Sequence, residues 1–262
     1  MPWLDVLLTL SALPVLAATT YLALLALLAR RAPAPPSGRG VRFDLVVPAH
    51  DEEAGIAQTV RSLLAIDYPA ELYRVVVVAD NCSDQTARRA SEAGARVLKR
   101  TDPERRGKGH ALAFAFERLG EEGVADAFVV VDADTLVSPN LLGAFASRIQ
   151  AGASALQADY GVRNPESSWR TRLLHLGFTL FHEVRSSGRE RLGLSCGLRG
   201  NGMAFTRSVL AEVPHDAFSV VEDVEYGIRL GLAGHRVHYV GEAQVLGEMP
   251  ASERATRSQR SR

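Results

Sequence analysis

The sequence predicts an α/β domain built on a mostly parallel sheet flanked by helices, preceded by one N-terminal transmembrane helix. Three observations lead to this prediction. An uncharged apolar run opens the chain, short strand-like and helix-like segments alternate after it, and the strand-like segments are rich in valine. This alternation, with valine-rich strands, is typical of a parallel sheet that helices cover on both faces.

Composition and charge agree with a globular protein. Of the 262 residues, 47% are hydrophobic and 23% charged, which is ordinary for a folded domain. Thirty basic and thirty acidic residues cancel, so no nucleic acid partner is expected from overall charge. Two cysteines, Cys82 and Cys196, are too few for a disulfide framework and suit a reducing compartment.

The first expected element is a transmembrane helix. From Val6 to Ala29 no residue is charged, and about 20 apolar residues suffice to cross a bilayer. Arg30 and Arg31 follow at once, so the positive-inside rule places the C-terminal side in the cytoplasm. A cleaved signal peptide is the alternative, but it would carry positive charge before its apolar run. We expect residues 1–31 to anchor the chain in the plasma (inner) membrane, where membrane lipid surrounds them.

A proline- and glycine-rich linker over residues 32–40 should separate this anchor from a folded domain over residues 41–262. The first half of the domain alternates regularly. The expected strands are 43–49, 74–80, 95–99 and 127–134. The expected helices that follow them are 53–66, 84–93, 108–119 and 139–150.

Beyond about residue 150 the alternation becomes irregular, which predicts a region that completes the same sheet. Strands are expected at 155–162 and 200–206, and a helix from residue 222 to about Gly234 precedes a last strand. A long helix is expected over residues 167–191. Because it is rich in leucine and phenylalanine, we expect it to pack on the core or to lie at the membrane surface.

Acidic residues follow three of the expected strands: Asp51 to Glu53, Asp80 with Asp84, and Asp132 with Asp134. Ligands of open α/β sheets bind at this edge. Side chains two apart on a strand point the same way, so Asp132 and Asp134 should face one spot. Clustered carboxylates favour Mg²⁺ or Mn²⁺, which leave coordination sites for phosphate. For a single residue, Asp84 above all, helix N-capping is the alternative.

Six segments carry a family resemblance. In order, the segments are VVPAHDEE, VVVVADNCSDQTA, RGKGHAL, VVVDADTLVSP, LRGNGMAF and VVEDVEYGIRL. With them the chain is similar, over residues 41–262, to family 2 inverting glycosyltransferases with the GT-A fold, and resembles their cellulose and hyaluronan synthase group. The resemblance implies transfer of a sugar, with inversion, from a nucleotide-diphosphate sugar to an acceptor hydroxyl, in polysaccharide synthesis. The donor of most such members is a UDP-sugar.

The resemblance also implies a donor site. Asp132 and Asp134 match the DxD motif, in which the second acid is the direct ligand of the metal that holds the diphosphate. Asp80 matches the carboxylate that reads the base. Pro48 begins a loop over the nucleotide, with Glu52 near the ribose or base.

A second group of residues is implied around the reacting atoms. Asp223 is similar to the catalytic base, which takes the proton of the acceptor hydroxyl as it attacks. Glu222, Lys108, Gly200 and Gly202 are expected to contact substrate, the lysine near the phosphates and the glycines on the donor-sugar and acceptor side. Alone, the two acids would be interpreted as first-turn residues of a helix, and the lysine as a solvated loop residue.

The end of the chain matches part of the Q-x-x-R-W motif of processive members. Gln259 and Arg262 supply the glutamine and the arginine, and no residue remains for the tryptophan. We expect these two residues to contact substrate and the domain to be truncated at its C-terminal end. A domain that naturally lacks the last element of the motif is the alternative.

Two other functions stay open at the level of sequence. One is a non-processive transferase with a lipid acceptor in place of a glycan, such as a polyprenyl phosphate or ceramide. The other is a nucleotide-sugar-binding subunit without turnover. Asp223 argues against this function, because a protein that only binds the donor needs no catalytic base. A dinucleotide-dependent oxidoreductase is disfavoured, since no G-x-G-x-x-G segment opens a helix.

Overall fold

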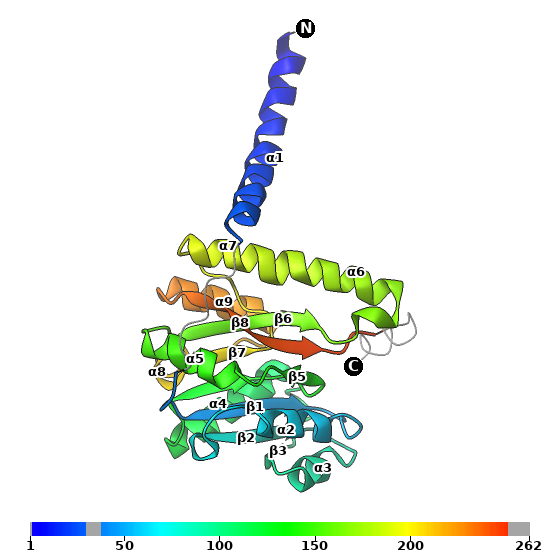
Figure 1. Cartoon of the computed structure of the whole chain (residues 1–262), viewed down its shortest axis with the longest axis vertical. Coiled ribbons are helices and arrows are strands. Elements are labelled where there is room, and N and C mark those ends of the chain that lie inside the picture. Colours follow the sequence, from blue (N-terminus) through cyan, green and yellow to red (C-terminus); the bar gives the residue numbers. More distant parts are fainter. Residues whose placement is uncertain (1, 30–37, 251–262) are drawn as a thin grey trace.

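The structure, a computed structural model, describes residues 2–29 and 38–250. One long helix, α1 (Pro2–Leu28), extends away from an α/β domain (Figure 1). From Asp5 to Leu28 the helix is long and apolar enough to cross a membrane, and it is almost entirely exposed. The expected N-terminal helix is therefore present.

Within the described residues, the domain is built on one eight-stranded sheet of order β3-β2-β1-β4-β7-β6-β8-β5. Strands β1 to β4 pair in parallel, β7 runs antiparallel to β4 and β6, β8 is parallel to β6, and β5 is antiparallel to β8. The strands are β1 (Phe43–Ala49), β2 (Tyr73–Asp80), β3 (Arg96–Arg100), β4 (Ala127–Val130), β5 (Thr135–Val137), β6 (Ala155–Val162), β7 (Met203–Thr206) and β8 (Val237–Gly247).

Helices cover both faces of the sheet, because successive side chains of the inner strands alternate between two apolar clusters. Leu45 and Val47 of β1 pack with α2, α3 and α5, whereas Val46 packs with α4, α8 and α9. The helices of the domain are α2 (Ile56–Leu64), α3 (Thr86–Glu92), α4 (Lys108–Glu122), α5 (Leu141–Gln150), α6 (Trp169–Phe178), α7 (Arg185–Arg191), α8 (Arg207–Glu212) and α9 (Glu222–Leu232). Short 3₁₀ turns lie at Ala70–Leu72 and Pro165–Ser167.

The expected strand 127–134 is where prediction and structure differ most. Strand β4 ends at Val130, and the next N–H, of Val131, donates the last hydrogen bond to β1, at 3.1 Å from Val46 O. The chain then turns, with Thr135 N donating to Asp132 O over 3.2 Å, and crosses to the sheet edge as β5. The two aspartates thus lie in a turn, so the argument from strand alternation was wrong.

The second half of the domain departs from the expected ranges in two further places. The long helix 167–191 consists of α6, a π-helical segment (Thr179–Val184) and α7, and it begins with a capping box at Ser168 and Thr171. The expected strand 200–206 begins only at Met203, because Gly200 and Gly202 have φ of 78° and 69°, outside strand conformation.

Helix α1 contacts the domain through α7. Gly188 lets the two backbones approach closely, since a Cβ at this position would lie 2.5 Å from Leu25 O. Arg189 Nη1 donates a hydrogen bond to Tyr21 Oη at 2.6 Å. Of the predicted linker, residues 32–37 lie outside the described part, while Gly38 N already bonds to Gly143 O of α5 at 2.9 Å. Contacts of the domain therefore begin before residue 41.

Candidate active site

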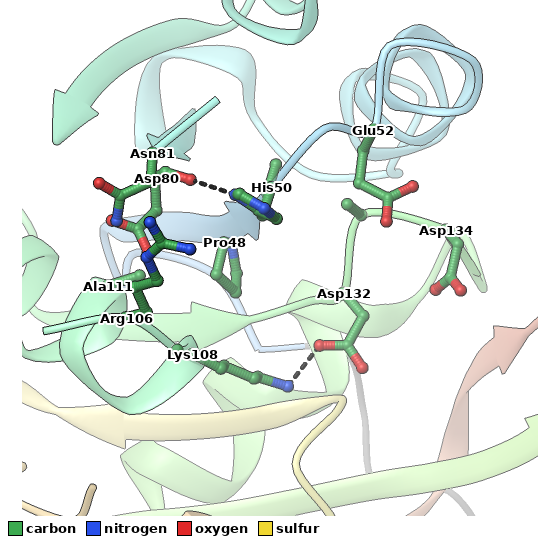
Figure 2. Close-up of a pocket in the computed structure, with 13 residues that line it drawn as sticks. Pro48, His50, Glu52, Asp80, Asn81, Arg106, Lys108, Ala111, Asp132 and Asp134 are labelled. Carbon is green, nitrogen blue, oxygen red and sulfur yellow. Dashed lines mark hydrogen bonds and ion pairs between the residues drawn. The ribbon is translucent and has the colours of Figure 1, made fainter. Parts of the chain in front are cut away.

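A pocket of about 390 Å³ opens at the carboxyl ends of β1, β2 and β4. Figure 2 shows polar side chains from these strand ends and from the start of α4 pointing into it. It is lined by Pro48, Ala49, His50, Glu52, Asp80, Asn81, Arg106, Gly107, Lys108, Ala111, Asp132, Ala133 and Asp134. Six residues expected from the sequence are thus brought together, namely Pro48, Glu52, Asp80, Lys108, Asp132 and Asp134.

Asp80 lies buried at one end of the pocket. Its Oδ1 accepts hydrogen bonds from Arg100 Nη1 at 2.7 Å and from Asn81 Nδ2 at 3.0 Å. Its backbone carbonyl bonds to His50 Nδ1 at 2.8 Å, as Figure 2 shows. Among the hydrogen bonds of the described residues, those that reach the Asp80 carboxylate end on Oδ1, so Oδ2 is the oxygen open to a ligand.

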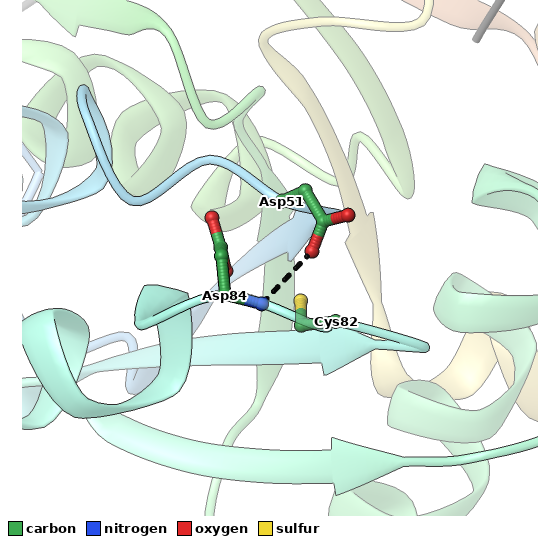
Figure 3. A group of neighbouring side chains, drawn as sticks. All are labelled: Asp51, Cys82 and Asp84. Carbon is green, nitrogen blue, oxygen red and sulfur yellow. Dashed lines mark hydrogen bonds between the residues drawn. The ribbon is translucent and has the colours of Figure 1, made fainter.

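Hydrogen bonds to acidic side chains connect the loop after β1 with the loop after β2. Asp51, Cys82 and Asp84 have ligand atoms within 4.8 Å of one another (Figure 3). Asp51 Oδ1 accepts from Ser83 N at 2.7 Å, which lowers the pKa of the Asp51 carboxyl. Asp84 Oδ1 accepts from Thr86 N at 2.8 Å, but the N-cap of α3 is Gln85, so Asp84 precedes the capping position that was its alternative role. Because N–H donors satisfy both carboxylates, this cluster joins two loops and is a poor candidate for a metal site.

The turn that carries Asp132 and Asp134 is clamped from two sides. Thr59 Oγ1 donates to Ala133 O at 2.6 Å. Buried Asn201 accepts from Asp132 N at 3.1 Å through Oδ1 and donates to Thr135 Oγ1 at 2.8 Å through Nδ2. Both carboxylates are therefore held at the pocket by packed elements, which is the preorganisation that a binding site needs.

The charges in this turn are unequally compensated. Lys108 Nζ pairs with Asp132 and also donates to Gly200 O at 2.6 Å. Asp134 lies at the mouth of the pocket with part of its surface exposed. Packing around the rest of this side chain, followed by the negative charge of Asp132, raises the pKa of the Asp134 carboxyl. A divalent cation between the two aspartates would remove this repulsion, so the donor set fits Mg²⁺ or Mn²⁺.

Asp223 and Glu222 reach the same region from the first turn of α9. A Cβ on Gly200 would lie 3.6 Å from both Asp223 Oδ2 and Lys108 Nζ, so this glycine separates the acid from the pocket lysine. Burial raises the pKa of Glu222, and the charge of Lys108 opposes that shift. Gly202 does not line the pocket, because a Cβ there would meet Val245 Cγ2 at 2.6 Å inside the core. Predicted residues 259 and 262 lie outside the described part.

Sequence reasoning missed five residues of the site: His50, Asn81, Arg100, Arg106 and Asn201. Asn81 stands out in the structure because its φ is 51°, which an asparagine adopts more readily than most residues. Arg106 and Asn201 belong to the glycine-containing segments RGKGHAL and LRGNGMAF. An arginine or asparagine within such a segment was the available signal.

Comparisons with known proteins agree on one group. The family model described as "Glycosyltransferase like family 2" matches residues 39–262. The probable glycosyltransferase YdaM of Bacillus subtilis is 24% identical over 230 residues, which is 84% of this chain and 54% of YdaM. The hyaluronan synthase of Streptococcus pyogenes is 30% identical over 162 residues, 56% of this chain and 36% of the synthase. The chain spans about half, or less, of these relatives.

Among solved structures, the mannosyltransferase PcManGT from Pyrobaculum calidifontis, in complex with GDP-Man and Mn²⁺, superimposes with a TM-score of 0.71. The match covers 97% of this chain and 71% of PcManGT at 20% sequence identity. At this identity the likeness concerns the fold, which is the GT-A fold expected from the sequence.

Proposed function

This chain belongs to glycosyltransferase-like family 2, and we propose that it is an inverting, metal-dependent hexosyltransferase that moves a sugar from a UDP-linked donor to an acceptor hydroxyl. The observation that carries the proposal is the composition of the pocket. Asp80 at one end, Lys108 at the start of a helix, and the pair Asp132 and Asp134 at the mouth match the base, diphosphate and cation of such a donor.

The diphosphate is proposed to lie at the N-terminus of α4. This helix begins at Lys108 after Gly107, whose φ is 111°, and both residues line the pocket. A helix N-terminus attracts anions through its free N–H groups and its dipole. Lys108 and Arg106 add positive charge. A Mg²⁺ or Mn²⁺ ion held by Asp134 and Asp132 would supply charge neutralisation for the diphosphate as it leaves.

A uracil base is favoured at Asp80. Uracil offers one imide N–H, and the Asp80 carboxylate offers one oxygen, Oδ2, because Arg100 and Asn81 bond to the other. Guanine presents two adjacent N–H groups, which would best be met by both oxygens of a carboxylate. The mannosyltransferase with GDP-Man thus serves as a contrast, and we propose that this chain differs from it in the base it binds.

Asp223 is proposed as the general base. It lies in the first turn of α9, where its Oδ2 and Lys108 Nζ would both lie 3.6 Å from a Cβ on Gly200. The acceptor oxygen forms a bond to the anomeric carbon while the bond from that carbon to the diphosphate breaks, and its electron pair leaves with UDP. The hydroxyl proton passes to the Asp223 carboxylate. Attack opposite to the leaving group inverts the anomeric centre.

The setting is proposed to be the plasma (inner) membrane, with α1 as anchor and the domain in the cytoplasm. Similarity to hyaluronan synthase favours a glycan acceptor and polysaccharide synthesis. A lipid acceptor is the second candidate, because an apolar groove runs along α6. It is lined by Trp169, Arg170, Leu173, Leu174, Gly177, Phe178, Phe181, His182 and Pro250.

Calorimetric titration of the detergent-solubilised chain with UDP- and GDP-sugars tests the donor and the metal together. We expect one UDP-sugar to bind in Mn²⁺ or Mg²⁺ and to lose most of its affinity in chelator. Asp80→Asn should weaken UDP-sugar binding without changing the metal requirement, whereas Asp134→Asn should lower binding in Mn²⁺ or Mg²⁺ to the level seen in chelator. Binding of no UDP-sugar by a folded sample would contradict the proposal, and preference for a GDP-sugar would overturn the role given to Asp80.

A further inference from the structure

Helix α6 and the start of the π-helical segment that continues it expose a row of large apolar side chains. Trp169, Leu173, Leu176 and Leu180 are 68%, 58%, 55% and 56% exposed. Spacings of four, three and four residues place them on one face of the helix. The opposite side carries the contacts to the domain, where the ring of Phe178 packs on Tyr160 at 5.3 Å between centroids. We call the four exposed residues the α6 stripe.

The α6 stripe lies at the end of the domain from which α1 departs. Figure 1 shows α6 and α7 running across the direction of α1, with α7 against its lower end. The joint is fixed by the Leu25 contact at Gly188 and by the hydrogen bond from Arg189 to Tyr21. A helix that crosses the axis of a membrane span at the end of that span lies along the bilayer surface.

The charge around the stripe is positive, although the whole chain is neutral. Residues 169–191 contain five arginines and two glutamates, a net charge of +3. The guanidinium carbon of Arg170 lies 5.5 Å from the centre of the Trp169 ring. Arginine beside tryptophan suits the headgroup region, where anionic lipids attract the cation and the indole keeps one polar edge wet. A second copy of this positive surface would repel the first.

We propose that the α6 stripe is inserted into the surface of an anionic lipid bilayer, at the boundary between headgroups and acyl chains. This inference rests on the proposed anchoring by α1 and extends it. The chain would meet the membrane at two places, a spanning helix and a surface helix nearly perpendicular to it. The apolar area on α6 would then be covered by lipid, which explains why this face carries leucine and tryptophan.

The two tryptophans of the chain, Trp3 and Trp169, make the test direct. Trp3→Phe leaves Trp169 as the sole tryptophan. The full-length variant is reconstituted into vesicles of phosphatidylcholine and phosphatidylglycerol whose acyl chains carry bromine either near the headgroup or near the bilayer centre. We expect stronger quenching by the shallow bromines, because a surface helix is buried about 5–10 Å into the interface.

Two control variants separate the possible results. Trp169→Phe leaves Trp3 to report whether α1 is inserted at all. Leu64→Trp, added to a chain with both native tryptophans replaced by phenylalanine, reports from the end of α2. Leu64 is 43% exposed and ends α2, a helix on the side of the domain away from α1 (Figure 1), so this tryptophan should not be quenched.

The α6 stripe also allows a charge variant. Leu173→Glu with Leu176→Glu, in the Trp3→Phe chain, should abolish most of the shallow quenching of Trp169. Quenching of Trp3 without quenching of Trp169 would overturn the inference and leave the anchor in place, and quenching of neither would overturn both. Donor binding is measured separately on the same vesicles, so a chain without transferase activity can still pass this test.

Discussion

Acidic and basic side chains lie at both edges of the first four strands, but they balance one another at only one of the two edges. At the amino edge, Arg74 binds buried Asp44 through two hydrogen bonds of 2.6 and 2.7 Å. Arg96 binds Glu122 through two bonds of 2.6 Å. Arg74 also reaches Glu122, at 3.2 Å. Two acids and two bases thus balance, and the bonds from Arg96 lower the pKa of Glu122 to about 2.

At the carboxyl edge the acids outnumber the bases. Arg100 pairs with Asp80 and Lys108 with Asp132. Asp134, Glu222 and Asp223 add further negative charge near Lys108. Here the pKa values of Asp134 and Glu222 are raised, opposite in direction to that of Glu122. The amino edge is thus balanced by its own side chains, whereas the carboxyl edge carries an excess of acids that the proposed cation would balance. Four experiments test this contrast.

The largest effect is expected at Asp223. Asp223→Asn removes the proton acceptor while keeping the size of the side chain. Turnover, measured as release of the nucleoside diphosphate, should fall by about 10²–10⁴-fold. Donor affinity should stay within a small factor, because this acid is proposed to act on the acceptor. A variant that keeps its full rate would show that another group accepts the proton.

The next effect is expected at Asp134. Asp134→Asn should lower turnover by on the order of 10²–10³-fold, because charge on the leaving diphosphate is no longer neutralised. The dependence of rate on Mn²⁺ concentration should also weaken. Asp84→Asn is the matched control, since that acid belongs to the loop cluster in Figure 3 and should leave the Mn²⁺ dependence unchanged.

At the amino edge the expected effect is on stability alone. Asp44→Ala leaves Arg74 without its buried partner and should lower the free energy of unfolding by about 3 kcal/mol. Denaturant unfolding of the detergent-solubilised chain measures this loss. Below the unfolding temperature, donor affinity and metal dependence should equal those of the unchanged chain. A change in either would mean that the two edges are coupled.

The smallest effect concerns pH. The pKa of Asp134 is raised, so its stabilising contribution without metal is present at low pH and is lost as pH rises through the raised pKa. A bound cation removes that loss. Mn²⁺ at 100 times its dissociation constant at pH 7.5 should stabilise the chain by about 2.7 kcal/mol at that pH. The same Mn²⁺ concentration should stabilise it less at pH 5, because protons then compete with the cation for Asp134, and thermal unfolding at both pH values checks this difference. Equal stabilisation, or none in the unchanged chain, would argue against the metal site.

The parts of the fold that local sequence predicts well are the buried strands. Val75 to Val78 form an unbroken apolar run in β2, and such a run can be predicted as a buried strand without knowing which strands pair with it. The end of β4 could not be predicted in this way. It depends on where hydrogen bonding to β1 stops, and the alternation of side chains carries no information on that.

The same distinction applies to the site. The acids at strand ends were visible because topology alone brings strand ends together. The partners of these acids were not. Arg100 reaches Asp80 because β3 pairs beside β2 with these two residues in register. Asn201 reaches Asp132 across 69 positions of sequence, a distance over which spacing gives no guidance.

The contact between Gly188 and Leu25 fixes the distance between α1 and the domain. The two backbones approach so closely that a Cβ on Gly188 would lie only 2.5 Å from Leu25 O, so no side chain fits between α1 and α7 at this point. For a chain anchored by α1, the height of Asp223 above the lipid is then set by protein geometry rather than by the linker. Acceptors would then be selected by the distance of their hydroxyl from the bilayer. Gly188→Leu should change which acceptors are used before it changes the transfer reaction itself.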